Sequence, residues 1–189
     1  GWITLMKEQE RDLGPLLEME KDVERLQTIT ERFSKVGSLP ELESVALIDT
    51  ASKTIQYLEK RTSNLVAFKV DFPKEEIYIP LNPQLFSWTL ENLIKNGIDA
   101  MKGKGEITLK ILEKEDEVAL EISDTGSGIK KEFYKKIFTP GFTSKKRGWG
   151  LGLSLAKRII TDYHKGKIDV KNSRVGKGTT FEIILKKTA

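Results

Sequence analysis

The sequence contains no cysteine and only one histidine, His164. Without cysteine, the chain has neither a disulfide framework nor a thiolate metal site. It also lacks a signal-peptide pattern and any apolar run approaching the roughly 20 residues that cross a bilayer. We therefore expect no membrane contact by this chain and a cytoplasmic location, with any membrane anchor of a full-length protein lying elsewhere. The chain starts at Gly1 and not at Met, which suggests a fragment.

The charged residues are mixed in sign and leave a net charge of only +4. No basic block with interleaved aromatic residues occurs, so the sequence does not favour nucleic acid as a partner. Apolar residues make up 38% of the 189 residues, which is enough for a core. This length suggests one ordinary domain and a smaller second part.

The first part is predicted to be a helical hairpin. Apolar residues recur in steps of three and four from Leu16 to Val36, and a shorter stripe precedes them between Trp2 and Leu13. Gly14-Pro15 between the two stripes suits a turn. The second stripe is longer than the first, so part of its apolar surface has no partner within the hairpin. Either another chain covers that surface, or the first helix is cut short, or both. We expect a homodimer through this hairpin.

The remaining chain alternates between helix and strand patterns. The overall class is α+β: a helical hairpin over residues 1–61, then an α/β sandwich over residues 64–189 with helices on one face of a mixed sheet. A helix-like spacing over 45–61 is included in the first part. Strands are expected at 64–72, 77–79, 105–113, 117–124, 167–172 and 179–186, and helices at 83–101, 130–137 and 151–163.

Asn92 and Asn96 are four residues apart and therefore share one face of the helix 83–101. Carboxamide oxygens are hard neutral ligands that suit Mg²⁺ beside substrate phosphates. A polar, solvent-exposed helix face would carry the same pattern, so both interpretations stay open at this point.

Asp124 ends an alternating strand and is followed by Thr-Gly-Ser-Gly. A carboxylate at a strand end, next to glycines that allow close approach to the backbone, can accept from an exocyclic amine. The alternative is an Asx turn that only ends the strand.

Three glycines at positions 148, 150 and 152 precede the helix 151–163. Free N–H groups at a helix start and nearby lysines suit a phosphate, although a mobile basic loop would look the same. Neither a Walker loop nor a dinucleotide fingerprint is present. Gly178-Thr179-Thr180-Phe181 opens the last strand, where the Thr179 hydroxyl is either a ligand contact or a turn residue.

The order of these motifs is more specific than each motif alone. Together they resemble the ATP-binding domain of sensor histidine kinases, within the ATPase superfamily of gyrase B, Hsp90 and MutL. The resemblance covers about 64–187, implies a Bergerat-type sandwich, and makes the helical region similar to the family's dimerisation and phosphotransfer hairpin. The motifs are Asn92/Asn96, Asp124-Thr-Gly-Ser-Gly, Phe138-Thr-Pro-Gly-Phe-Thr-Ser-Lys145, Gly148-Trp-Gly-Leu-Gly-Leu and Gly178-Thr-Thr-Phe.

The resemblance implies that ATP and Mg²⁺ are the cofactors. Asn92 and Asn96 match the residues that hold Mg²⁺ and phosphate, and Lys95 resembles a basic phosphate neighbour. Glu91 is placed like an acidic residue that helps to activate the acceptor.

The adenine end of the site follows from the same resemblance. Asp124 matches the aspartate that accepts from the adenine amino group. Gly126, Gly128, Ile129 and Thr179 correspond to residues that shape the adenine pocket.

Residues 126–150 resemble the family's ATP lid, with Phe138 and Phe142 as its packing anchors. Trp149 departs from the family, which often has a small or hydroxylated residue there. The nucleotide contacts expected from the lid and its hinge are Phe142, Thr143, Lys145, Arg147, Gly148, Gly150, Leu151 and Gly152.

The family's acceptor histidine, in a His-Glu/Asp-x-x-x-Pro setting, is absent. His164 lies at the end of the helix 151–163 and is expected to cap it. We therefore expect a catalytic core that transfers phosphate from ATP to a histidine outside this sequence and on to a response regulator. The alternatives are a catalytically silent ATP-binding dimerisation module and a protein-serine kinase or anti-sigma factor of the same superfamily.

Overall fold

The computed structural model describes residues 41–143 and 149–188. The chain divides into two compact units, 1–40 and 41–189. The two stripes of the predicted hairpin, over 2–13 and 16–36, therefore lie outside the described residues, whereas residues 41–61 of the predicted helical part belong to the second unit. None of the described helices is long and apolar enough to cross a membrane.

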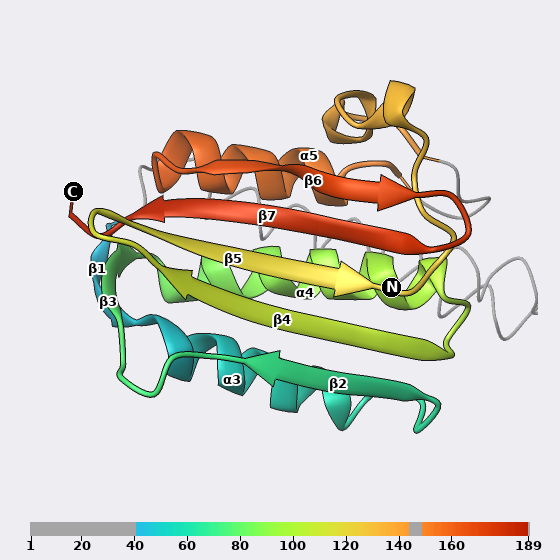
Figure 1. Ribbon diagram of the computed structural model, residues 1–189. Helices are drawn as coiled ribbons and strands as arrows, with labels where there is room; N and C mark the ends of the chain where they lie inside the picture. Colours follow the sequence, from blue (N-terminus) through green and yellow to red (C-terminus); the bar gives the residue numbers. More distant parts are fainter. Residues whose placement is uncertain (1–40, 144–148, 189) are drawn as a thin grey trace, which may run out of the picture. The chain divides into compact units, whose positions relative to one another are not determined.

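A five-stranded mixed sheet forms one layer of the unit (Figure 1), in the order β2-β4-β5-β7-β6. β2 runs parallel to β4, and every other neighbouring pair is antiparallel. The strands are β2 (Val66–Asp71), β4 (Gly105–Glu113), β5 (Glu117–Asp124), β6 (Lys167–Arg174) and β7 (Gly178–Lys186). A small antiparallel pair, β1 (Glu43–Ala46) with β3 (Tyr78–Leu81), lies beside it.

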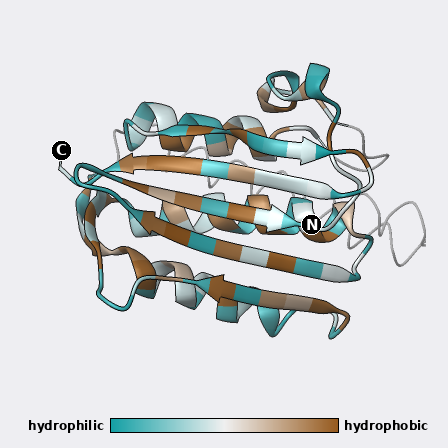
Figure 2. Ribbon diagram, in the orientation of Figure 1, coloured by the Kyte–Doolittle hydropathy of each residue, from teal (hydrophilic) through white to brown (hydrophobic). Residues whose placement is uncertain are grey.

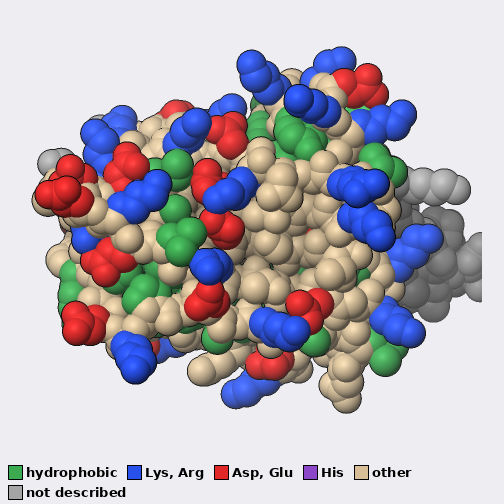
Figure 3. Space-filling model, in the orientation of Figure 1, with side chains coloured by type: hydrophobic (Ala, Val, Ile, Leu, Met, Phe, Trp, Pro, Cys, Tyr) green, Lys and Arg blue, Asp and Glu red, His purple; other side chains and the backbone are tan. Residues whose placement is uncertain are grey.

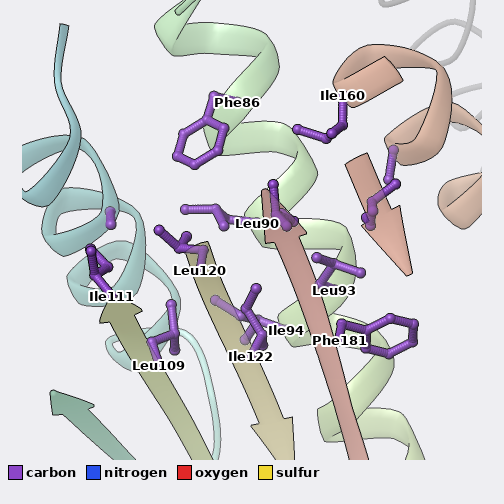
Figure 4. Close-up of a cluster of buried hydrophobic side chains, with 14 of the residues drawn as sticks. Phe86, Leu90, Leu93, Ile94, Leu109, Ile111, Leu120, Ile122, Ile160 and Phe181 are labelled. Carbon is purple, nitrogen blue, oxygen red and sulfur yellow. The ribbon is translucent and has the colours of Figure 1, made fainter. Parts of the chain in front are cut away.

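Three helices cover one face of the large sheet, which confirms the predicted sandwich (Figure 1). They are α3 (Leu47–Glu59), α4 (Pro83–Ala100) and α5 (Gly152–Arg158). Apolar residues alternate along the strands (Figure 2), and the inward set packs against α4 (Figure 4). The fully buried centre includes Phe86, Leu90, Ile94, Leu109 and Ile183.

The opposite face of the sheet carries polar side chains (Figure 3). Lys171 donates to Glu121 at 2.6 Å and to Glu182 at 2.8 Å, across three strands. Ser123 and Thr180 form a hydroxyl pair at 2.9 Å on the same face. This alternation explains why β4 and β5 are found with the bounds that their sequence pattern predicts.

The unit boundary differs from the expected one. α3 was expected in the helical part that ends at Arg61, but the division falls between Pro40 and Glu41. The reason is that α3 buries Leu47, Ala51, Ile55 and Leu58 in the sandwich core. The expected start of this helix at Val45 also differs, because residues 43–46 pair with β3 as a strand.

Two other helices differ in detail from their predictions. The helix expected over 130–137 is a pair of short 3₁₀ helices, η1 (Lys131–Phe133) and η2 (Lys136–Phe138). The helix expected over 151–163 consists of α5 and a π-helical turn, η3 (Ile159–Tyr163). Helix period alone does not distinguish these forms.

Candidate nucleotide-binding site

Asp124 is the last residue of the central strand β5, at the edge where the sheet meets α4. Its Oδ1 accepts from the backbone N–H of Gly126 at 2.7 Å. Burial raises the pKa of Asp124, and backbone hydrogen bonds from Gly126 and Thr179 oppose that rise. The carboxylate is thus partly desolvated and held in one orientation, which suits an acceptor for a ligand N–H group.

Two glycines allow this close packing. A Cβ on Gly97 of α4 would lie 2.8 Å from Cδ1 of Ile107 and 3.0 Å from Cβ of Asp124. A Cβ on Gly126 would lie 2.7 Å from Cβ of Ala100, also on α4. Gly97 was not among the predicted site residues, although it directly follows Asn96, and only its close contact with Asp124 reveals its role.

Asn92 lies on α4 next to the start of α5. Its Oδ1 is 3.1 Å from the position that a Cβ on Gly152 would take, so a larger residue there would have to displace the Asn92 side chain by a few tenths of an ångström. Its Nδ2 is buried and has no hydrogen-bond partner among the described residues. An unsatisfied buried donor costs free energy, so this amide is a candidate for contact with an anionic ligand. Asn96, one turn further along α4, is half-buried and has a polar partner of its own.

Gly150 forms the base of the predicted lid. Its φ of +64° lies in the left-handed region, and a Cβ there would meet Phe142 O at 2.6 Å. The N–H of Gly141 donates to Gly150 O at 3.1 Å and joins the two ends of the described lid residues. Leu151 then serves as the N-cap of α5.

The aromatic anchors of the lid also pack inward. The ring centroid of Phe142 is 5.7 Å from that of Phe133 in η1. Phe138 is buried and meets Phe181 of β7 edge-on at 6.3 Å. Phe138 therefore connects the predicted lid with the core directly, and Phe142 packs against the same core beside Phe133.

Ile129 and Thr179 meet through a residue that was not predicted. Ser173 Oγ accepts from the N–H of Ile129 at 2.8 Å and lies 2.9 Å from Thr179 Oγ1. Gly128, with φ of +70°, packs against the backbone of Arg174, the last residue of β6. Since serine is common in turns, no pattern in the sequence distinguishes Ser173 in advance.

The remaining predicted residues lie apart from this cluster or outside the described residues. Lys95 forms an ion pair with Glu91 at 3.0 Å on the exposed side of α4. Thr143 is exposed, and the side chain of Trp149 is 50% exposed. Lys145, Arg147 and Gly148 lie outside the described residues.

His164 is 5% exposed, and both ring nitrogens are hydrogen-bonded. Nδ1 lies 2.9 Å from Ile159 O, and Nε2 accepts from the N–H of Asn82 at 3.0 Å. The expected capping role is therefore seen, with a neutral ring, because Nε2 must be an acceptor. Burial lowers the pKa of His164, and the two hydrogen bonds oppose this effect.

Comparison with known proteins gives a consistent result. Residues 82–189 match the family of histidine kinase-, DNA gyrase B-, and HSP90-like ATPases. The C4-dicarboxylate transport sensor protein DctB of Rhizobium meliloti (strain 1021) is 31% identical over 170 residues, which are 87% of this chain and 27% of that protein. Sporulation kinase D of Bacillus subtilis (strain 168) is 28% identical over 192 residues, 98% of this chain and 38% of that kinase. The chain thus spans only 27% to 38% of these relatives' length.

Solved structures agree with this match. The catalytic domain of the histidine kinase ThkA is 29% identical, with a TM-score of 0.72 over 79% of this chain and 97% of that domain. The structure of ThkA in complex with the response regulator protein TrrA matches 100% of this chain and 56% of the kinase chain, at 25% identity and a TM-score of 0.77. Since the family match covers more than half of its residues, the chain belongs to the family of histidine kinase-, DNA gyrase B-, and HSP90-like ATPases.

Proposed function

We propose that this chain is the ATP-binding catalytic core of a two-component sensor histidine kinase. The observation that supports this most directly is the double contact made by α4. Its Gly97 packs against Asp124, and its Asn92 faces Gly152 at the start of α5. The two contacts are about 7.5 Å apart along the helix, at ~1.5 Å per residue. One helix thereby contacts both the proposed base acceptor and the proposed phosphate-binding start of α5.

The residues present fit ATP with Mg²⁺. The unpartnered Nδ2 of Asn92 suits a phosphate oxygen, and the carboxamide oxygens of Asn92 and Asn96 suit Mg²⁺. No group of three or more acidic, histidine or cysteine side chains that could hold a metal occurs among the described residues.

ATP supplies the phosphoryl group, and Mg²⁺ neutralises charge on its phosphates. The chain's own part is binding and positioning. Asp124 accepts from the base, Gly150 and Gly152 let the start of α5 come close to the phosphates, and Asn92 donates to them. Such fixed donors provide most of what phosphoryl transfer requires. Glu91 is the proposed residue for acceptor activation, and its release from Lys95 would accompany that step.

The acceptor of the phosphoryl group is proposed to be a histidine outside this sequence. His164 is buried, and neither ring nitrogen is free to attack a phosphorus atom. By analogy with ThkA, which is seen in complex with a response regulator, a receiver domain is the proposed next partner. A homodimer through the predicted helical hairpin, which precedes residue 41, and a cytoplasmic location complete the proposal.

Transfer between chains tests this function. The present chain is mixed with labelled ATP, Mg²⁺ and a full-length form of the protein that carries Asp124→Asn and is therefore expected to bind ATP more weakly. The ATP concentration is kept low enough that the present chain binds it and the variant does not bind it appreciably. We expect acid-labile phosphate on the full-length partner and none on the present chain. Label on His164, or no label on the partner although this chain binds ATP, would contradict the proposal.

A further inference from the structure

Ser173 lies at a junction between the start of the lid and the last two strands. Its Oγ contacts the N–H of Ile129 at 2.8 Å, the carbonyl oxygen of Gly178 at 2.9 Å and the hydroxyl of Thr179 at 2.9 Å. Its own carbonyl oxygen accepts from the hydroxyl of Tyr134 at 2.7 Å. Four contacts on one small residue are more than a strand end requires.

A bulge in β6 puts Ser173 in this place. The pairing register between β6 and β7 shifts between Val170 and Asn172, so that Ser173 and not Asn172 lies opposite Thr179. Thr179 belongs to the inward-facing set of β7 with Phe181, whereas Thr180 faces the opposite side. Bulges beside binding sites commonly redirect a side chain in this way.

The protons in this cluster can be assigned by counting. A serine hydroxyl has one proton and two lone pairs. The Ile129 N–H uses one lone pair of Ser173, and the Gly178 carbonyl can only accept, so it takes the serine proton. The remaining contact, to Thr179, uses the second lone pair. Thr179 must therefore donate its proton to Ser173.

This assignment determines what Thr179 offers to a ligand. With its proton bound to Ser173, its oxygen has only lone pairs left, and no other hydrogen bond to it is found among the described residues. Thr179 is 4% exposed and pairs with Asp124 across β5 and β7. Two acceptors, a carboxylate and a hydroxyl oxygen, thus lie at the same end of the site.

We propose that Ser173 is a positioning residue for base selectivity: it holds the Thr179 hydroxyl as an acceptor, which favours a 6-amino purine and disfavours a 6-oxo purine. This inference rests on the proposed function. A 6-amino group donates to two acceptors directly or through one water, whereas a 6-oxo group there faces only lone pairs. Groups left unpaired in a buried polar site are a strong source of discrimination.

The test compares ATP with ITP, because inosine carries a 6-oxo group and no 2-amino group. Binding constants for both nucleotides with Mg²⁺ are measured by calorimetry on the wild-type chain and on Ser173→Ala. The variant frees the Thr179 proton to turn toward a 6-oxo group. We expect the ratio of ATP to ITP affinity to fall about tenfold, as for the loss of one hydrogen bond, and Ser173→Thr to restore it.

Ser123→Ala is the matched control. It removes the equivalent hydroxyl pair with Thr180, which spans β5 and β7 on the uncovered face. We expect the ratio of ATP to ITP affinity of Ser123→Ala to equal that of the wild type. If Ser173→Ala does not fold, Thr179→Val decides the question, because it removes the same acceptor without changing the shape of the side chain.

The outcomes separate the two proposals. An unchanged ratio in folded Ser173→Ala, or an equal fall in Ser123→Ala, overturns the role of Ser173 and leaves ATP binding intact. An unchanged ratio of ATP to ITP affinity in Thr179→Val also overturns the role of Ser173 and leaves ATP binding intact. A wild-type chain that binds neither nucleotide contradicts the proposed function itself.

Discussion

At the residue scale, the carboxyl group of Asp124 combines partial burial with fixed hydrogen bonds. Burial is the largest influence and raises its pKa above the ordinary 3.8. The folded chain therefore binds a proton at this group at a higher pH than the unfolded chain does. An acceptor of this kind is lost at a higher pH than for an ordinary aspartate, because protonation replaces a lone pair with a donor.

We predict that Asp124→Asn weakens ATP binding by about ten- to hundredfold at neutral pH, the loss expected for a hydrogen bond to a charged group. Wild-type affinity should also fall as the pH is lowered through the raised pKa, whereas the variant's affinity should not follow it. Titration calorimetry between neutral and mildly acid pH measures both effects. Asp169→Asn, on the uncovered face, is the control. Equal affinity of wild type and Asp124→Asn would contradict the adenine assignment.

His164 gives a second prediction, which concerns stability. Its pKa is lowered in the folded state relative to the ordinary 6.5, so the unfolded chain binds the proton first. The free energy of unfolding should therefore fall as the pH drops below about 6.5. Above that pH, the contribution of the neutral ring is fully present.

The measurement is urea unfolding of the wild type and His164→Gln between pH 5 and 8, a range in which histidine alone titrates ordinarily. His164 is the only histidine, so a difference between the pH dependence of unfolding of the wild type and of the variant can be assigned to its ring. Parallel curves over the whole range would show that the ring has no shifted pKa.

Not all residues of the site could be predicted from the sequence. The local patterns at Asp124 and Asn92 indicated candidate positions, but each pattern also fitted a structural role, and only the order of the motifs implied a role in nucleotide binding. Gly97 and Ser173 could not be predicted. Gly97 matters through its contact with β5, and Ser173 through a bulge, and neither long-range pairing leaves a local signal.

At the scale of the elements, the base of the lid depends on backbone geometry at Gly150. Its positive φ alone would strain any other residue, and its closeness to Gly141 and Phe142 adds a steric conflict. Gly141 also has a positive φ, of 82°, but a Cβ there would meet nothing within 4 Å. A comparison of substitutions at Gly141 and Gly150 therefore distinguishes the effect of backbone strain from the effect of steric crowding.

We predict that Gly141→Ala costs only the backbone penalty, about 1 kcal/mol, and leaves ATP affinity unchanged. Gly150→Ala should cost more and should weaken ATP binding severalfold, because Phe142 and the start of α5 must move apart. Thermal unfolding and ATP titration of both variants test this. If both variants bind ATP equally well, Gly150 is not a crowded hinge.

Helices and strands were predicted correctly where one hydrophobic period extends over many residues. β4 and β5 alternate over their whole length, and Asn82 caps α4 through its Oδ1, which accepts from the N–H of Leu85 at 3.1 Å. Prediction failed where the element was short. β1 has four residues, and Val45 and Ala46 fit the period of the helix that follows as well as that of a strand.

At the scale of the whole molecule, the large core belongs to residues 41–189. α3 contributes Leu47, Ala51, Ile55 and Leu58 to the same cluster as the central strands. From the sequence, α3 was expected to belong to the helical part. An amphipathic stripe shows that one face of a helix is buried, but it does not show which element covers that face.

We predict that a chain starting at Glu41 folds cooperatively and binds ATP as well as the full sequence does. A chain starting at Asn64, the boundary expected from the sequence, should lose α3 and unfold, since several fully buried side chains are removed together. Circular dichroism during urea unfolding, followed by ATP titration, compares the two. Cooperative folding from Asn64 would show that α3 is dispensable.

The position of β7 in the sheet has a consequence for synthesis. β7 is the last strand along the described chain, yet it lies between β5 and β6 and is the only neighbour of β6 in the sheet. During synthesis on the ribosome, β6 therefore has no neighbouring strand, and β5 has one unpaired edge, until residue 186 has left the exit tunnel. Exposed strand edges invite aggregation. Stalled or prematurely terminated chains should accordingly be substrates for chaperones, however stable the finished unit is.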